Sequence, residues 1–155
     1  MSLLRISTGL FIAIAGLTAP ASARAQALER INPPELYKYG TISQAVRAGN
    51  LLFVSGQVGT DKDGEPVSII MSEQVEQALK NLKTVLATQN ADFSHIAKTT
   101  IYVTNISEFG VSQVQEVMKK YFGDAKRAGT LVQVGALADP ALKFEIDAIV
   151  VLPGR

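Results

Sequence analysis

The sequence predicts one α/β domain of the α+β kind, a mixed β-sheet with two helices on one face. Three observations lead to this fold class. The chain has 155 residues, of which 47% are hydrophobic, enough for a single buried core. Two segments carry apolar residues at helical spacing, and five show the short apolar runs or alternation of strands. Because helices separate some of the strands, crossover connections and a mixed sheet follow.

The first 25 residues have the order of a secretory signal peptide. Arg5 precedes an apolar stretch over residues 10–17, and Ala23-Arg24-Ala25 supplies small residues at a cleavage position. The apolar stretch is too short for a comfortable membrane span. We therefore expect residues 1–25 to be removed, which leaves a periplasmic or secreted protein without membrane contact. The alternative is an uncleaved N-terminal helix or anchor.

The domain itself is expected to span residues 38–155, after an irregular lead-in over residues 26–37 that contains Pro33-Pro34. Residues 43–48 alternate loosely, and the nearly continuous apolar run 51–58 predicts a strand covered on both faces. The elements that follow are a short strand at 66–70, a helix capped by Ser72 and ended by Asn90, a strand over 97–104, a helix over 110–121, and strands over 130–137 and 142–152.

Each helix is defined by one apolar stripe. The stripes consist of Val75, Ala78, Leu79, Leu82, Val85 and Leu86 in the first helix, and of Val114, Val117, Met118 and Tyr121 in the second. The sheet face that the helices leave uncovered is also rich in apolar residues. Since such a face is a liability in a monomer, we expect it to be buried between identical subunits.

Composition excludes several classes of function. Fifteen Lys and Arg face fourteen Asp and Glu, so no basic excess is available for nucleic acid. The chain has no cysteine, which removes thiol nucleophiles and cysteine-based metal sites. Its single histidine, His95, leaves no histidine cluster, and we interpret it as an exposed loop residue. Glu145 and Asp147 share one face of the last strand, either as an interface edge or as a catalytic pair.

Six segments, in order, resemble the Rid family of reactive intermediate deaminases, also called YjgF-like. They are SQAVRAGNLLFVSGQ (43–57), QVEQALKNL (74–82), KTTIYV (98–103), YFGD (121–124), VQVGALADP (132–140) and FEIDAI (144–149). The resemblance covers about residues 38–151. It implies a chorismate-mutase-like fold, assembly as a homotrimer, and small-molecule pockets in the clefts between subunits.

The resemblance also implies a reaction and its residues. Deaminases of this family hydrolyse reactive imino acids to keto acids and ammonia with no metal or cofactor. Their glutamate on the last strand, which helps to position the attacking water, corresponds to Glu145. An aromatic position of many members is Ile42 here. The substrate-binding positions correspond to Ser55, Gly56, Gly129 and Leu131, with Gln113 or Gln115 from the second helix.

The sequence departs from the family at one position. Gly129 stands where active members have the arginine that binds the substrate carboxylate. Three hypotheses follow: the pocket binds another small molecule and imine deamination is impaired, Arg127 replaces the missing arginine, or the domain is a secreted interaction module. Arg127 lies two residues away on the same strand face, displaced by about 6–7 Å. If Arg127 does not replace the missing arginine, we expect it to be a solvent-facing basic residue.

Overall fold

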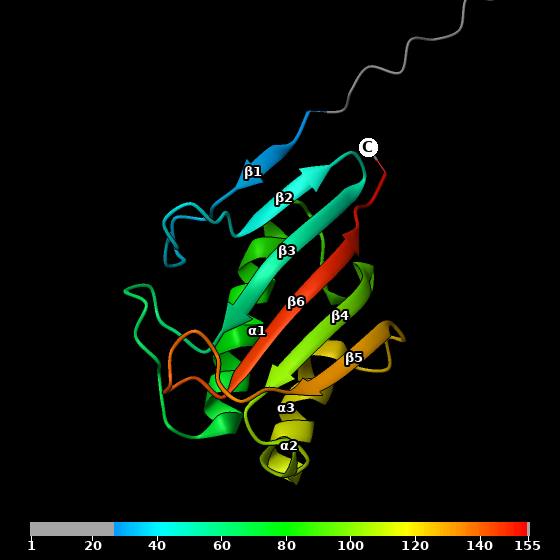
Figure 1. The fold of residues 1–155 in the computed structure, drawn as a ribbon. Coiled ribbons are helices and arrows are strands. Elements are labelled where there is room, and N and C mark those ends of the chain that lie inside the picture. The colour runs from blue at the N-terminus through cyan, green and yellow to red at the C-terminus, as the bar shows by residue number, and fades with distance from the viewer. Residues whose placement is uncertain (1–26, 155) are drawn as a thin grey trace, which may run out of the picture.

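The computed structural model describes residues 27–154 as one six-stranded sheet with helices packed on one side (Figure 1). The strands are β1 (Glu29–Ile31), β2 (Ala45–Ala48), β3 (Leu51–Val58), β4 (Ile96–Val103), β5 (Ala128–Gln133) and β6 (Phe144–Val151). The helices are α1 (Met71–Ala87), α2 (Ile106–Phe109), α3 (Ser112–Phe122) and the 3-10 helix η1 (Phe93–His95).

The predicted fold class is confirmed. The sheet order is β1-β2-β3-β6-β4-β5, in which β4 and β5 pair in parallel and all other neighbours are antiparallel. Figure 1 shows α1 and α3 behind the same face of the sheet, with the other face open. The parallel pair follows from the crossover through α2 and α3, since a helical connection returns the chain to the same end of the sheet.

The core lies between this sheet and α1. All six residues of the predicted α1 stripe are fully buried, and they share one cluster with β3 and β6 side chains such as Leu52 and Phe144. Burying one such side chain stabilises the fold by about 1.5–3 kcal/mol. The spacing of apolar residues in α1 is therefore sufficient to orient the helix on the sheet.

The chain before β2 is more ordered than the sequence predicts. The lead-in over residues 26–37 was expected to be irregular, but Glu29–Ile31 forms β1 and pairs with β2. This correction has a tertiary cause, because three residues carry no periodic signal and the strand exists by adding to the exposed edge of β2. The structure places no strand at residues 66–70, where only Pro66 makes an isolated bridge to Thr60.

The start of α1 is not capped as predicted, whereas its end is. Helix α1 begins at Met71 after Ile70, without a side-chain cap from Ser72. Asn90 has φ of 53° and follows the end of α1, as expected for a residue that tolerates left-handed backbone. The predicted second helix is preceded by the short helix α2, whose Ser107 and Glu108 amides donate to Asn105 Oδ1. His95 accepts from the Asp92 amide and closes a capping box in η1, so it is not a loop residue.

Two strands are shifted relative to the prediction. The pairing of β4 with β6 slips between Ile96 and Lys98, so Ile96 is buried and Ala97 exposed, against the expected alternation. Strand β5 begins at Ala128 and ends at Gln133, earlier than the predicted 130–137. Gly129 therefore lies inside a strand.

The predicted signal peptide over residues 1–25 lies outside the described residues and stays a prediction. It would be tested by mass spectrometry of the N-terminus of the protein from its native host. Within residues 27–154, no helix is long and apolar enough to cross a membrane.

Candidate functional site

A cavity of about 170 Å³ lies where β3 ends and β6 begins. Three of the residues predicted for the site line it together: Ser55 and Gly56 from β3, and Glu145 from β6. The remaining walls are Tyr39, Ile42, Ser43, Gln44, Val58, Ala138 and Leu142. Most of these side chains are apolar, so a ligand here would meet one carboxyl group in a largely apolar enclosure.

Ser55 and Gly56 reach the cavity because they form a β-bulge. The pairing of β3 with β6 shifts between Val54 and Gln57, which places two β3 residues opposite one residue of β6. The Ser55 hydroxyl donates to the Ser43 carbonyl over 2.7 Å, and the Ser55 amide donates to the Gln44 carbonyl over 3.0 Å. Because its proton is engaged, the Ser55 hydroxyl can only accept from a ligand.

Gly56 provides the space in which the Glu145 carboxyl group lies. A Cβ atom at Gly56 would collide with that carboxylate. Within residues 27–154, no side-chain hydrogen bond reaches the Glu145 carboxylate, although the residue is half-buried. Burial, and secondly the charge of Asp147, raise the pKa of Glu145 above its usual range. A carboxylate whose pKa is raised is a stronger base than that of an exposed glutamate, which suits it to accept a proton from a bound group.

Asp147 has a different environment from Glu145, although both lie on the open face of the sheet as predicted. Its carboxylate accepts from the Thr100 amide over 3.2 Å and from the Tyr102 hydroxyl over 3.3 Å. Burial and the Asp147 charge raise the pKa of Tyr102. Asp147 is therefore held by β4, which leaves Glu145 as the member of the pair that faces the cavity.

The other predicted site residues lie on a different part of the molecule. Gly129 pairs with Thr99, and Leu131 with Ile101. Both β4 partners are buried toward the helices, whereas Glu145 lies on the open face. Strand β5 is the outer strand, and β4 separates it from β6 (Figure 1). In one chain, Gly129 and Leu131 therefore do not reach the cavity that contains Glu145.

Arg127 is not the solvent-facing residue that one interpretation of the sequence expects. Its guanidinium carbon lies 3.5 Å from the centre of the Phe122 ring, and its Nε donates to the Thr99 hydroxyl over 3.1 Å. Burial lowers the pKa of Arg127 below its usual range. A Cβ atom at Gly129 would lie 3.9 Å from the same Thr99 hydroxyl, so Arg127 leans toward the space that Gly129 leaves open.

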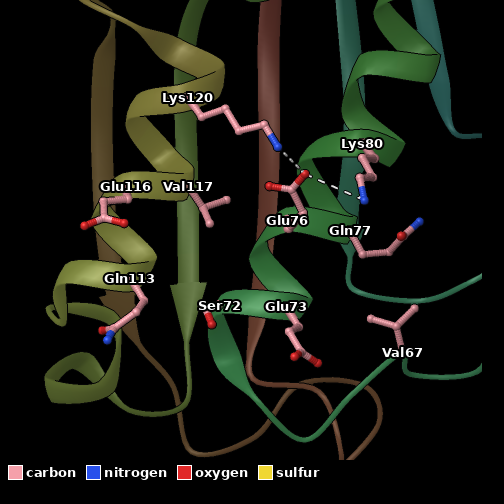
Figure 2. A pocket seen from close by; sticks show the side chains of 10 residues that line it. All are labelled: Val67, Ser72, Glu73, Glu76, Gln77, Lys80, Gln113, Glu116, Val117 and Lys120. Atoms are coloured by element: carbon pink, nitrogen blue, oxygen red, sulfur yellow. Dashed lines mark hydrogen bonds and ion pairs between the residues drawn. The ribbon is translucent and has the colours of Figure 1, made fainter.

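Of the two glutamines considered from the second helix, the structure places Gln115, not Gln113, beside Arg127. Figure 2 shows Gln113 in a hollow of about 570 Å³ between α1 and α3. Glu76 of α1 pairs across that hollow with Lys120 of α3 at 2.7 Å, and within α1 it pairs with Lys80 at 3.7 Å. The Glu76–Lys120 pair joins the two helices on the outer side of the helical layer, away from Glu145.

Two residues that support the cavity were missed by the sequence analysis. Tyr39 adds an aromatic wall, in the segment where the sequence shows only a pair of tyrosines beside two prolines. Gln74 is fully buried on α1 and holds the loop that carries Leu142. Its Nε2 donates to the Ser68 and Ala141 carbonyls over 2.7 and 2.8 Å, and its Oε1 accepts from the Lys143 amide over 2.7 Å. The signal in the sequence that could have indicated Gln74 was a polar residue directly before the apolar stripe of α1.

Substitution of Gly56 by alanine is expected to disable the cavity without unfolding the chain. The new methyl group meets the end of a flexible side chain, so the Glu145 carboxylate must turn away while the backbone stays in place. We expect ligand binding or turnover in the cavity to fall at least about tenfold, and the free energy of unfolding to change by less than about 1 kcal/mol. Calorimetry with a cavity ligand and urea denaturation measure the two effects. Global unfolding of Gly56→Ala would contradict this account.

Comparison with known proteins identifies the family of this chain. The family described as Endoribonuclease L-PSP matches residues 34–152. A RutC family protein of Pyrococcus horikoshii is 37% identical over 111 residues, 71% of this chain and 86% of that protein. The rat protein named 2-iminobutanoate/2-iminopropanoate deaminase is 39% identical over 113 residues, 72% of this chain and 80% of the relative.

Solved structures show the same fold. A Rid family protein of Yersinia pestis superposes with a TM-score of 0.75 at 32% identity, covering 81% of this chain and 100% of that one. RidA from a Psychrobacter species gives a TM-score of 0.72 at 27% identity, over 80% of this chain and 99% of its own. Since both the sequence and the fold match, the chain belongs to the Rid/YjgF family, whose model is described as Endoribonuclease L-PSP.

Proposed function

We propose that this protein binds a small molecule in the Glu145 cavity and hydrolyses 2-iminobutanoate and 2-iminopropanoate only weakly. The observation that carries the proposal is the contrast between two positions. Among residues 27–154, no side-chain hydrogen bond reaches the Glu145 carboxyl group, which lies over Gly56, whereas Gly129 has no side chain and faces the Thr99 hydroxyl. The residue for proton transfer is present, and the expected cation for a substrate carboxylate is absent.

The chemistry open to Glu145 is the addition of water to a C=N bond. The water oxygen bonds to the imine carbon while its proton passes to the Glu145 carboxylate. That proton then moves to the nitrogen and gives a carbinolamine. The carbinolamine hydroxyl passes its own proton through Glu145 to the amino group as the C–N bond breaks and the C=O bond forms, so that ammonia departs and a keto acid remains. The raised pKa of Glu145 brings the carboxyl group closer to the pH at which it both accepts and returns the proton. No described residue at this cavity supplies a positive charge for the substrate.

An assay of imine hydrolysis tests the proposal directly. Imines generated from several amino acids would be presented to the full-length mature protein, and the release of keto acid followed. We expect turnover of the two small imino acids to be roughly ten- to several-hundred-fold below that of a relative with arginine at the position of Gly129. Wild-type turnover at the rate of such a relative would refute the proposal.

A second candidate function is supported by the position of Arg127. Its Nε donates to the Thr99 hydroxyl, and the same hydroxyl lies next to Gly129. An arginine is therefore available close to the position at which the family's arginine is expected. In this alternative the protein is an active imine deaminase in which Arg127 binds the carboxylate. Substantial wild-type turnover that disappears in Arg127→Ala would support it, and turnover that survives in Arg127→Ala would exclude it.

We also propose that the mature protein is a homotrimer with its ligand sites between subunits. Two observations support this. The open sheet face leaves Phe53 and Val151 each 44% exposed, and Val132 of the outer strand 37% exposed. In addition, the predicted site residues divide into a group at Glu145 and a group at Gly129 that one chain does not join. A neighbouring subunit would cover the apolar face and bring the two groups together.

Sedimentation velocity at micromolar concentration is expected to show a compact trimer. Replacing Phe53 by a charged residue, as in Phe53→Glu, should dissociate it, because a charge would be buried at the interface. Lys62→Glu, on an exposed loop, changes charge without touching the face and serves as control. A stable wild-type monomer at these concentrations would contradict the trimer.

A further inference from the structure

The charges at the Glu145 cavity are of one sign. Within the described part of the chain, its lining holds the Glu145 carboxyl group and no lysine, arginine or histidine. Asp147 lies two residues along β6 on the same face, and its charge contributes to the raised pKa of Glu145. The loop that supplies Ala138 and Leu142 to the lining also carries the exposed Asp139. A ligand that enters the cavity therefore meets negative charge.

Lysines on the neighbouring segments do not balance the charge of Glu145. The Lys143 ammonium, just before β6, pairs at 2.7 Å with a glutamate of α2. On the open face, Lys98 donates to the Thr100 hydroxyl over 2.9 Å. Thr100 is the pairing partner of Asp147, not of Glu145. In the part that the structure describes, neither lysine forms an ion pair with Glu145.

A half-buried carboxylate in this position is best satisfied by a cation that donates hydrogen bonds. Burial disfavours a lone charge, and burial is the first cause of the raised pKa of Glu145. An ammonium or iminium group donating to the Glu145 oxygens would supply both the opposite charge and the N–H donors. A carboxylate ligand would instead bring a second negative charge into the same enclosure. The lining therefore favours a ligand with a positive charge.

The rest of the lining determines the body of the ligand. Its apolar part consists of Ile42, Val58, Ala138, Leu142 and the ring of Tyr39. Tyr39 packs edge-on against Tyr37, with ring centroids 4.8 Å apart, and aromatic rings attract cations through their electron-rich faces. The cavity of about 170 Å³ fits a body of the size of a phenyl ring, since an apolar cavity of about 150 Å³ holds benzene.

We propose that the Glu145 cavity selects a small organic cation, with an ammonium or iminium nitrogen on an apolar body of about phenyl size. Substrates of this class are imines that lack a carboxylate. When water adds to such an iminium ion, its oxygen bonds to the carbon and both of its protons pass through Glu145 to the nitrogen. The products are an aldehyde or ketone and an ammonium ion. This inference rests on the proposed function, because it places the ligand in the same cavity.

Three probes with the same ring separate the charge of the ligand from its body. Near neutral pH benzylamine is a cation, benzyl alcohol is neutral and benzoate is an anion. In the assembled full-length mature protein, benzylamine is expected to shift the amide signal of Gly56 and to leave that of Gly123, which follows α3, in place. It should bind at least about tenfold more tightly than benzyl alcohol, and benzoate should bind more weakly than either.

Variants assign the selectivity to one carboxylate. Glu145→Gln should weaken benzylamine at least about tenfold and leave benzyl alcohol within about threefold. Glu116→Gln is the matched control, since it removes the same charge from an exposed position of α3, and should stay within about twofold. Ile42 lines the cavity and is exposed, so adding Ile42→Lys to Glu145→Gln should reverse the order and favour benzoate.

Turnover tests the substrate class. Phenylmethanimine, generated in the assay by flavin-dependent oxidation of benzylamine, should release benzaldehyde faster with the protein than without it. We expect this acceleration to exceed that for 2-iminopropanoate at least about tenfold and to be lost in Glu145→Gln. No acceleration would overturn the assignment of carboxylate-free imines as substrates.

Other results would overturn the cation itself. Binding of benzoate to the wild-type protein as tight as that of benzylamine would do so, as would benzylamine binding that survives Glu145→Gln or leaves the Gly56 signal unmoved. If benzyl alcohol or benzoate is preferred and shifts Gly56, the inference fails and the cavity remains the ligand site of the proposed function. Fast hydrolysis of 2-iminobutanoate would refute the proposed function even if benzylamine binds through Glu145.

Discussion

Replacing Gly129 by arginine is expected to raise the hydrolysis of 2-iminobutanoate and 2-iminopropanoate by roughly ten- to several-hundred-fold. The carboxylate of an imino acid must lose water in the site, which is strongly disfavoured without a cation. A charge-assisted pair with arginine contributes about 1.5–3 kcal/mol, and about 1.4 kcal/mol corresponds to a tenfold change in rate. The position accepts a side chain, since a Cβ atom there has only Thr99 Oγ1 nearby, at 3.9 Å.

Comparing Gly129→Arg with Gly129→Lys separates the effect of the positive charge from that of the planar guanidinium. Gly129→Lys supplies the charge without the planar fork and should recover less activity than Gly129→Arg. The new side chain would share the Thr99 hydroxyl with Arg127, so the double variant Gly129→Arg with Arg127→Ala tests whether the two cations compete. Failure of Gly129→Arg to raise the rate in a correctly folded protein would mean that the carboxylate is held elsewhere.

Replacing Gln74 by leucine is expected to lower the free energy of unfolding by about 3 kcal/mol or more. The substitution leaves the Ser68 and Ala141 carbonyls and the Lys143 amide without their partner. A buried polar group without a partner costs about 1–3 kcal/mol. Urea denaturation at fixed protein concentration measures the change. Gln113→Leu makes the same chemical change on the exposed face of α3 and should stay within about 0.5 kcal/mol.

The same substitution is expected to weaken the cavity before it unfolds the chain. Ala138 and Leu142 form one wall of the cavity, and their loop is held to α1 through Gln74. Hydrogen exchange of the amides at 138–143 should therefore increase in Gln74→Leu under conditions in which the α1 amides stay protected. Equal loss of protection in both segments would show that the loop and the core open together.

Much of the fold could be predicted from local patterns. The six apolar residues of the α1 stripe repeat at helical spacing, and all six are fully buried in the structure. The alternation in the last strand placed Glu145 and Asp147 on one face, and the structure agrees. These predictions succeed because burial of one face imposes its period on the sequence, and a period is visible without any tertiary information.

The resemblance to the Rid family also drew attention to Ser55, Gly56 and Glu145, which lie in segments that resemble it, and it predicts the departure at Gly129. The sequence could not predict which of them meet. Glu145 reaches Gly56 through a bulge in β3, and a bulge depends on the register between two strands far apart in the chain. The contacts of Arg127 with Phe122 and Thr99 likewise exist only after β5 pairs with β4. The sequence therefore favours interpreting Arg127 as a solvent-exposed cation.

The sequence by itself therefore determined the class of fold and the burial of α1, and it predicts that Gly129 stands at the position of the arginine of the family's deaminases. Only the tertiary structure decided that β1 adds to the sheet edge and that the groups at Glu145 and Gly129 lie apart in one chain. It also decided that Asp147 is held by Thr100, whereas no side chain within residues 27–154 makes a hydrogen bond to the Glu145 carboxylate. The physical reason is the distance along the chain over which each property is determined. Apolar periodicity is a local property of the chain, whereas strand register, hydrogen-bond partners and enclosure arise between segments that meet only in the folded protein.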